Sequence, residues 1–379
     1  MRRPVEAYRA EDGSRIYRIP MEVFPGFWGY AHLLLTSDSA FLIDVGSGFG
    51  QSNPDLEAGL EAVRAEYGEG VQWRDLDAVL ITHGHIDHFG GLPYVLERSQ
   101  APLGVHELDL RVLMNYEERL TIVGKRLAEY LIEAGVDEQG QHELMDDYML
   151  NKSLFSSVPV DFTYEAAGMQ VGPLEIHHMP GHCPGQVVLR YREILFTGDH
   201  VLQGITPHQA PERLSLSTGL GHYLASLERV RPLAEDIRLT LGGHEGPIKQ
   251  LDQRITEIED LHRTRLEKVL GVLKEPHSIA EVSQALFPTA KGYHILLALE
   301  EAGAHVEFLA QRGRLAIANM DDITEPAPTP IRYQRLDGQP PVGASVPPLE
   351  FPKHRTPGDL PDALTGPEFG AGGESHVRI

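Results

Sequence analysis

The chain has 379 residues, of which 41% are hydrophobic, a formal net charge of −22 and a single cysteine. This length allows one large domain and a smaller one, the lone cysteine excludes an internal disulfide, and the acidic balance disfavours an extended basic surface for nucleic acids. No apolar stretch approaches the roughly 18 residues of a membrane span, and no apolar segment follows the arginines at the N-terminus. We therefore expect a cytoplasmic protein that neither crosses nor binds a membrane.

The N-terminal part predicts strands that alternate with a helix. Strands are expected at 15–20, 30–36, 40–45 and 78–81, because each range carries apolar residues that a sheet can bury. The aromatic segment 21–29 is expected to connect the first two strands and to overhang either the site or the sheet edge. Leu56, Leu60 and Val63 recur at helical spacing before Gly68, which predicts a helix. A strand, helix and strand in this order predict a layered α/β fold.

Residues of the kind that bind metals are dense in the loop after the strand at 78–81. The sequence at 83–88 is His-Gly-His-Ile-Asp-His, so three imidazoles and a carboxylate lie within six residues. A loop past a strand end can fold around a metal ion and bring such side chains together. Further along the chain, His182, Asp199 and His244 each follow a glycine directly. The sequence therefore predicts a metal centre assembled from several loops.

The order of these residues, HxHxDH followed by His, Asp and His, resembles the metallo-β-lactamase-fold hydrolases over about residues 15 to 250. That superfamily includes glyoxalase II thioesterases, lactonases and endoribonuclease-like members. The resemblance implies a four-layer αββα sandwich that binds two divalent metal ions. It implies that His83, His85 and His182 hold the first ion, that Asp87, His88 and His244 hold the second, and that Asp199 bridges the two.

The resemblance also implies how the site works. Nitrogen and oxygen donors suit Zn²⁺, and iron or manganese is chemically open as well. A hydroxide shared by the two ions would be the nucleophile, and Asp87 would be the catalytic residue that orients it or moves its proton. Asp44 is expected to orient the ligands, and Cys183 is expected to lie beside the site without binding metal. His222 or Tyr223 is expected to contact the substrate.

The rest of the catalytic domain predicts a helical insertion and a second group of strands. Leucines close to a helical period predict helices in 107–157, with breaks at Gly135 and Gly140. This insertion is expected either to line an apolar substrate pocket or simply to pack. Strands near 169–176, 186–191 and 193–196 are expected to deliver His182 and Asp199, and a helix is expected at 221–227.

The chain is expected to divide into three parts. Residues 1–250 form the predicted metallo-β-lactamase-fold domain. Residues 251–322 predict three helices and a terminal strand or wing at 305–317, which resembles the small C-terminal winged-helix appendage of the endoribonuclease-like members. This appendage is expected to be separable from the chemistry. Residues 323–379 are rich in proline and glycine and are expected to be disordered.

Two main functions follow from these observations. The acidic composition and the apolar insertion favour a hydrolase of a small thioester, ester or lactone. The winged-helix-like appendage favours the alternative, a metal-dependent endoribonuclease or nuclease of the same fold, and appendages of this kind also form homodimers. An oxidative iron enzyme is a third option. The expected partner is thus a small-molecule substrate, with nucleic acid as the alternative.

Overall fold

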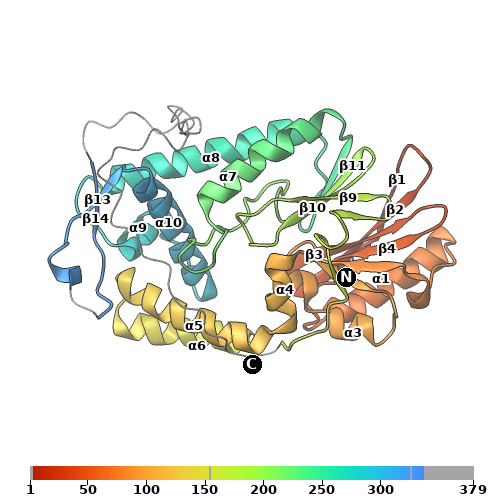
Figure 1. The fold of residues 1–379 in the computed structure, drawn as a ribbon, viewed down its shortest axis with the longest axis horizontal. Coiled ribbons are helices and arrows are strands. Elements are labelled where there is room, and N and C mark those ends of the chain that lie inside the picture. Colours follow the sequence, from red (N-terminus) through yellow and green to blue (C-terminus); the bar gives the residue numbers. More distant parts are fainter. Residues whose placement is uncertain (1–2, 153–154, 325–326, 337–379) are drawn as a thin grey trace, which may run out of the picture. The chain divides into compact units, whose positions relative to one another are not determined.

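Two β-sheets packed face to face form the centre of the structure, a computed structural model that describes residues 3–152, 155–324 and 327–336 (Figure 1). The first sheet consists, in this order, of β1 (Glu6–Arg9), β2 (Arg15–Phe24), β3 (Phe27–Leu35), β4 (Ala40–Ile43), β5 (Ala78–Leu80), β6 (Leu103–Val105) and β7 (Phe162–Thr163). The second contains β8 (Gln170–Val171), β9 (Leu174–His178), β10 (Val187–Tyr191), β11 (Ile194–Gly198) and β12 (Leu239–Gly242). Strands β4 to β7 are parallel, as are β11 and β12.

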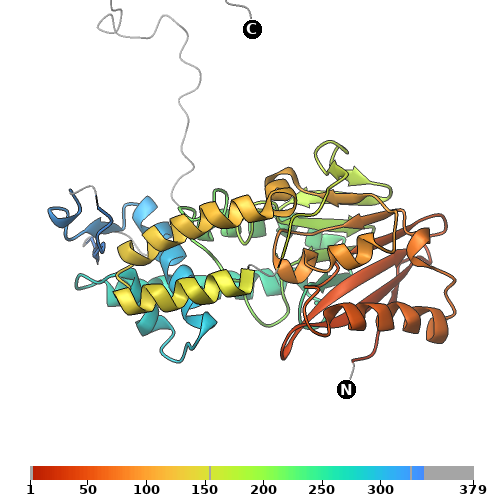
Figure 2. The same cartoon turned by 90° about the horizontal axis from the view of Figure 1, so that it is seen from below.

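Helices flank the sheets and extend beyond them. They are α1 (Ser52–Tyr67), α2 (Ile86–Phe89), α3 (Leu92–Leu96), α4 (Glu107–Met114), α5 (Tyr116–Glu133), α6 (Glu138–Lys152), α7 (Leu220–Val230), α8 (Leu251–Val272), α9 (Ile279–Leu286) and α10 (Tyr293–Gln311). Figure 2 shows α1 along the outer side of the first sheet. Figure 1 shows α7 and α8 running from the second sheet towards α9 and α10. The predicted mixed α/β fold is therefore confirmed.

Alternating side chains on β2 and β3 explain why the layers stack. Ile16 and Leu34 point into the core between the sheets, where they join Phe196 of the second sheet. Tyr17 and Leu33 point to the opposite face and join the core that α1 and α3 cover. Because successive side chains of a strand face opposite sides, one strand supplies both cores. Burial on both faces fixes the register of each strand.

The β2–β3 hairpin corrects one prediction. Residues 21–29 do not form a loop, because Glu22 pairs with Trp28 and Phe24 pairs with Phe27 across a tight turn at Pro25 and Gly26. The two strands stay paired up to this turn, because a hairpin satisfies its own backbone hydrogen bonds. Phe24 and Phe27 therefore lie on paired strands on either side of the turn.

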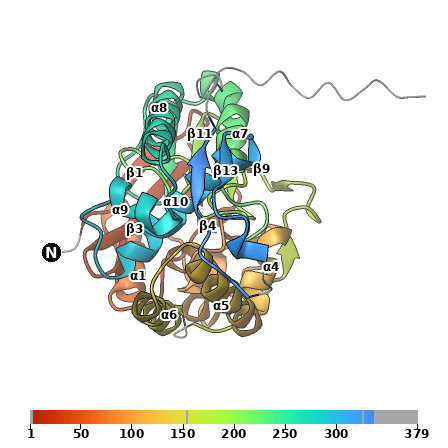
Figure 3. The same ribbon diagram turned by 90° about the vertical axis from the view of Figure 1, so that its left-hand side faces the viewer.

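The helical insertion is present as α4, α5 and α6, and α5 and α6 lie side by side (Figure 3). Gly135, with φ of 83°, follows the end of α5 as expected. Gly140 does not interrupt the helix, because it lies inside α6, where its N–H donates to Asp137 Oδ1 at 2.8 Å. A glycine in the first helical turn is readily tolerated when a side chain caps that turn.

The C-terminal region differs from the prediction at two places. Residues 305–309 belong to α10 and not to a strand. The strand β13 (Leu315–Ile317) pairs with β14 (Tyr333–Arg335), so the range expected to be disordered from residue 323 contains ordered chain, whereas 337–379 lie outside the described residues. Tyr333 also exchanges backbone hydrogen bonds with His277, which a composition-based argument cannot foresee. The winged-helix identity of this region stays a prediction.

Candidate metal centre

The predicted metal ligands meet where the strands of both sheets end. His83 and His85 lie on the loop after β5, and Asp87 and His88 lie on the short helix α2. The other three sit in separate loops: His182 between β9 and β10, Asp199 directly after β11, and His244 after β12. The carboxyl ends of neighbouring strands thus bring together residues that are far apart in sequence.

No helix of the described residues is long and apolar enough to cross a membrane.

Two groups of three ligands form around neighbouring points. The imidazole nitrogens of His83, His85 and His182 lie within 4.8 Å of one another. The second group, Asp87, His88 and His244, satisfies the same limit, and His244 Nε2 lies 3.2 Å from Asp87 Oδ2. This division of ligands corresponds to the two sites that the sequence resemblance implies.

Asp199 faces both groups. Its Oδ2 lies 3.8 Å from His182 Nε2 of the first group and 3.3 Å from His244 Nε2 of the second. Its Oδ1 lies 3.4 Å from His88 Nε2. A carboxylate in this position can share its two oxygens between two ions.

The centre fits divalent ions by two structural criteria. His88 Nε2, His182 Nε2 and Asp199 Oδ1 are buried without a hydrogen-bond partner. Buried polar atoms are normally paired, so cations bound by the two groups would satisfy all three. A Cβ atom at Gly243 would lie 2.5 Å from His88 Cε1 and 2.6 Å from Asp199 Oδ1, which shows how closely the backbone passes. Histidine nitrogen and carboxylate oxygen donors suit zinc, iron and manganese.

The charges inside the centre are unusual for a buried site. Burial lowers the pKa of His83 and His85 well below the usual range, so both imidazoles are neutral. Burial acts in the same direction on His244, but Asp199 and Asp87 outweigh it and raise the pKa of that imidazole to about 10. Burial alone would raise the pKa of Asp199, yet His244 and His88 hold it well below the usual range. The site thus contains carboxylates that require cationic partners.

Groups behind the ligands fix their orientation. Asp44 accepts hydrogen bonds from Thr82 N at 2.8 Å, Thr82 Oγ1 at 2.9 Å and His88 Nδ1 at 2.9 Å. This confirms the prediction that Asp44 orients a ligand. His244 Nδ1 donates to the carbonyl oxygen of Trp28 at 2.8 Å, so Nε2 is the nitrogen that faces the centre and would bind an ion in place of its proton. Such partners are the usual means of fixing the ligating nitrogen.

Asp109 of α4 is an important residue that sequence reasoning missed. It is fully buried and accepts hydrogen bonds from Gly84 N at 2.7 Å and Gly185 N at 3.0 Å, so it joins the loop of His83 and His85 to the loop of His182. Cys183 Sγ lies 3.4 Å from Asp109 Oδ2 and belongs to none of the candidate ligand groups found in the described residues. A single acid on an amphipathic helix carries no sequence signal for this role.

The predicted substrate residues have other partners in the structure. The His222 side chain is half-exposed, and its Nε2 lies 2.9 Å from Glu212 Oε1. Tyr223 is fully buried, and its hydroxyl donates to the carbonyl oxygen of His200 at 3.0 Å. Contact of His222 or Tyr223 with a substrate stays a prediction.

Comparison with known proteins places the chain in a family. The model of the metallo-beta-lactamase superfamily matches residues 27–244, so the chain belongs to that superfamily. It is accordingly a metal-dependent hydrolase. Among solved structures, a metallo-beta-lactamase family protein from Thermus thermophilus aligns with a TM-score of 0.63 and 24% identity, over 85% of this chain and 98% of that one. A beta-lactamase domain protein from Burkholderia ambifaria aligns with a TM-score of 0.66 and 22% identity, over 87% and 94%. These likenesses show the fold.

Similar sequences include RNA-processing proteins and a hydrolase. Endoribonuclease YSH1 of Candida albicans is 28% identical over 233 residues, which are 54% of this chain and 26% of that protein. Probable metallo-hydrolase YqgX of Bacillus subtilis is 27% identical over 132 residues, which are 34% of this chain and 50% of that protein. The chain therefore spans half or less of the length of these two relatives.

Proposed function

We propose that this protein hydrolyses a small thioester, ester or lactone, with two Zn²⁺ ions bound by the seven ligands. The observation that carries the proposal is the aromatic rim of the metal centre, which we define as Phe24, Phe27 and Phe49. The Phe27 ring lies 4.4 Å from the His244 ring, centroid to centroid, although 41% of the residue is exposed. Phe24 and Phe49 are also exposed, and their ring centroids lie 6.4 Å apart.

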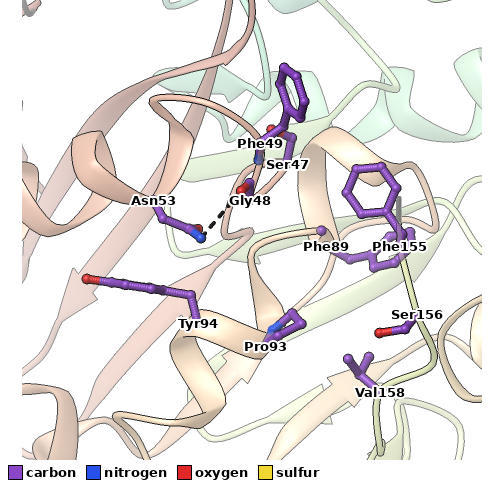
Figure 4. Close-up of a pocket in the computed structure, with 11 residues that line it drawn as sticks. Ser47, Gly48, Phe49, Asn53, Phe89, Pro93, Tyr94, Phe155, Ser156 and Val158 are labelled. Carbon is purple, nitrogen blue, oxygen red and sulfur yellow. Dashed lines mark hydrogen bonds between the residues drawn. The ribbon is translucent and has the colours of Figure 1, made fainter. Parts of the chain in front are cut away.

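A cavity of about 210 Å³ continues the aromatic rim beyond Phe49 (Figure 4). Phe49, Tyr94 and Phe155 line it from three segments of the chain, together with Phe89, which follows the predicted ligand His88 in the sequence. Polar residues, namely Ser47, Asn53 and Ser156, also line the cavity. Exposed apolar groups that cluster beside a cavity typically bind ligands. An acyl or lactone carbon chain suits such a surface, whereas a phosphate backbone does not.

The insertion also borders the centre, which supports its role as a pocket wall. Desolvation lowers the pKa of Lys152 at the end of α6, while the charge of Asp87 acts against this shift. Desolvation raises the pKa of Tyr293, the first residue of α10, and Asp87 adds to that shift. Lys152 and Tyr293 are therefore our candidates for polar contacts with the carbonyl end of a substrate.

The metal ligands, Asp87 and Phe27 have different roles in the proposed reaction. When bound, two divalent ions would lower the pKa of a shared water and polarise the carbonyl oxygen under attack. Burial opposes ionisation of Asp87, but His88 and His244 hold its pKa low, so the carboxylate is charged and can accept a hydrogen bond that orients the water. Its Oδ2 faces His244, which leaves Oδ1 for this task. Phe27 shields His244 from bulk water on one side.

Endoribonuclease activity is the alternative, and the likeness to Endoribonuclease YSH1 supports it. The formal net charge of −22 acts against this alternative, because binding to RNA depends on neutralising phosphates. The chain also covers 26% of that relative, so the remaining three quarters of the relative have no counterpart in this alignment.

The decisive experiment measures hydrolysis of a thioester, a lactone and single-stranded RNA side by side, together with metal content. We expect turnover of a small apolar substrate that depends weakly on salt and disappears in His83→Ala. Phe27→Ala should raise KM for this substrate, whereas Leu261→Ala, which removes a similarly exposed apolar side chain from α8, should not. RNA cleavage that requires metal, is lost in His83→Ala and falls steeply with salt would overturn the proposal.

A further inference from the structure

The segment 206–213 lies between the metal centre and the C-terminal helices. On one side it contacts a metal ligand, because His182 Nδ1 donates to the carbonyl oxygen of His208 at 2.7 Å. This bond places the proton of His182 on Nδ1 and leaves a lone pair on Nε2, the atom that is buried without a partner. The position of one carbonyl group therefore determines whether His182 can bind an ion.

On its other side, the same segment is held by three glutamates of α10. Glu300 Oε2 lies 3.2 Å from His208 Nε2, and Glu301 Oε2 accepts the N–H of Gln209 at 2.8 Å. One to two turns further along, Glu307 Oε2 accepts the N–H of Glu212 at 2.7 Å. Glu301 thus accepts the N–H of the same peptide group whose carbonyl accepts from His182, and Glu300 holds the His208 side chain.

Glu301 is itself fixed by α8. Arg265 Nη1 donates to Glu301 Oε1 at 2.8 Å and to Thr206 Oγ1 at 3.2 Å. The residue is buried, and a buried ion pair with additional hydrogen bonds is geometrically well defined. The carboxylate therefore has a fixed direction in which it receives the N–H of Gln209.

The histidines near Glu301 do not form a competing metal site. His262, Glu301 and His305 are close enough to hold an ion. However, both oxygens of Glu301 already accept hydrogen bonds, one of them from the Arg265 cation, which would repel a second positive charge. His305 Nδ1 donates to the Glu301 carbonyl at 2.7 Å, and its Nε2 lies 3.1 Å from His262 Nδ1. These contacts hold Glu301 and His305 of α10 against α8.

We propose that α10 is part of the metal centre, and that Glu300 and Glu301 are positioning residues that orient His182 through His208 and Gln209. Glu301 holds the peptide group between His208 and Gln209, and Glu300 holds the His208 side chain. The carbonyl of that peptide holds the His182 N–H, so the imidazole presents Nε2 to the first ion. This inference does not depend on which substrate is hydrolysed. It reverses the expectation that the C-terminal appendage is separable from the chemistry.

The test compares Glu301→Ala with Glu281→Ala in the full-length chain. Glu281 lies in the neighbouring helix α9, caps it through Ser278 and pairs with Arg332, so its loss perturbs the same region without touching the segment 206–213. Metal-free proteins are titrated with Co²⁺ against a competing chelator, which separates the affinities of the two sites. Loss of an outer hydrogen-bond partner typically weakens metal binding about 10- to 100-fold. We expect at least a tenfold loss at the site of His83, His85 and His182 in Glu301→Ala, little change at the other site, and no loss in Glu281→Ala.

A second readout follows the His182 proton directly. In NMR spectra of the Zn²⁺-loaded protein, the slowly exchanging Nδ1–H signal of His182 should broaden or shift in Glu301→Ala and stay unchanged in Glu281→Ala. If Glu301→Ala does not fold, Glu300→Gln provides the same measurements at a side chain with 13% exposure. Unchanged affinity at the first site, equal losses at both sites, or an unchanged Nδ1–H signal would overturn the proposal.

Discussion

Substitution of Asp109 by Asn is the sharpest test of how the metal loops are held together. Asp109 is isosteric with Asn, so the change keeps the shape of the side chain and alters its hydrogen-bonding capacity. The carboxylate accepts from Gly84 N and Gly185 N with different oxygens. An amide has one acceptor oxygen, and its NH₂ group would face the second backbone N–H. A buried pair of donors would then point at each other.

The magnitude follows from these contacts. A hydrogen bond to a charged acceptor contributes about 1.5–3 kcal/mol, and a buried donor without a partner costs about 1–3 kcal/mol. Burial raises the pKa of Asp109, so the substitution also removes a desolvation penalty that offsets part of the loss. We expect a net loss of about 2–4 kcal/mol in the free energy of unfolding. For a chain of this size, that loss corresponds to a fall in Tm of about 3–6 °C.

The assay is denaturant unfolding of the metal-free and Zn²⁺-loaded proteins, with metal content measured after dialysis. The matched control is Asp137→Asn, where an exposed aspartate accepts the N–H of Gly140 and Asn caps a helix equally well. Because Asp109 joins the loops of two ligands, its replacement should also weaken metal binding. A loss below about 1 kcal/mol with unchanged metal content would refute the view that Asp109 holds the loops together.

The remaining predictions concern the bridge, the protons of the site and the C-terminus. Asp199→Ala should lower metal occupancy at both sites in metal analysis, and near-full occupancy would contradict the bridging role. In the metal-free protein, the pKa of His244 in the folded state, about 10, lies above its ordinary value of 6.5, so the stabilisation from its protonation is complete below pH 6.5 and is lost as the pH rises towards 10. Denaturant unfolding should show this decline without metal and a weaker one with Zn²⁺. Truncation after Asp322 should lower Tm because it removes β14 and its pairing with β13, and an unchanged Tm would contradict this role of β14.

The sequence alone predicted the residues of the candidate metal centre and the layered fold around it. Metal ligands need particular donor atoms, and the spacing of His83, His85, Asp87 and His88 after an apolar run is a local pattern that a reader can recognise without coordinates. The apolar runs at β4, β5 and β11 likewise predict buried strands. The fold brings the donor atoms of each predicted ligand group to within 4.8 Å of one another.

Only the tertiary structure decided which other residues support the site. Asp109, Glu300 and Glu301 occupy ordinary positions for acids on amphipathic helices. Asp109 and Glu301 accept backbone N–H groups that lie 76 and 92 positions away in the sequence, and Glu300 contacts the distant side chain of His208. Backbone donors have no residue identity, so no motif marks their partners. The order of the chain at Tyr333 has the same origin, because it arises from pairing with β13 and His277 rather than from its own composition. Sequence patterns indicate which residues can form hydrogen bonds or be buried. The tertiary structure decides which distant group becomes the partner of each residue.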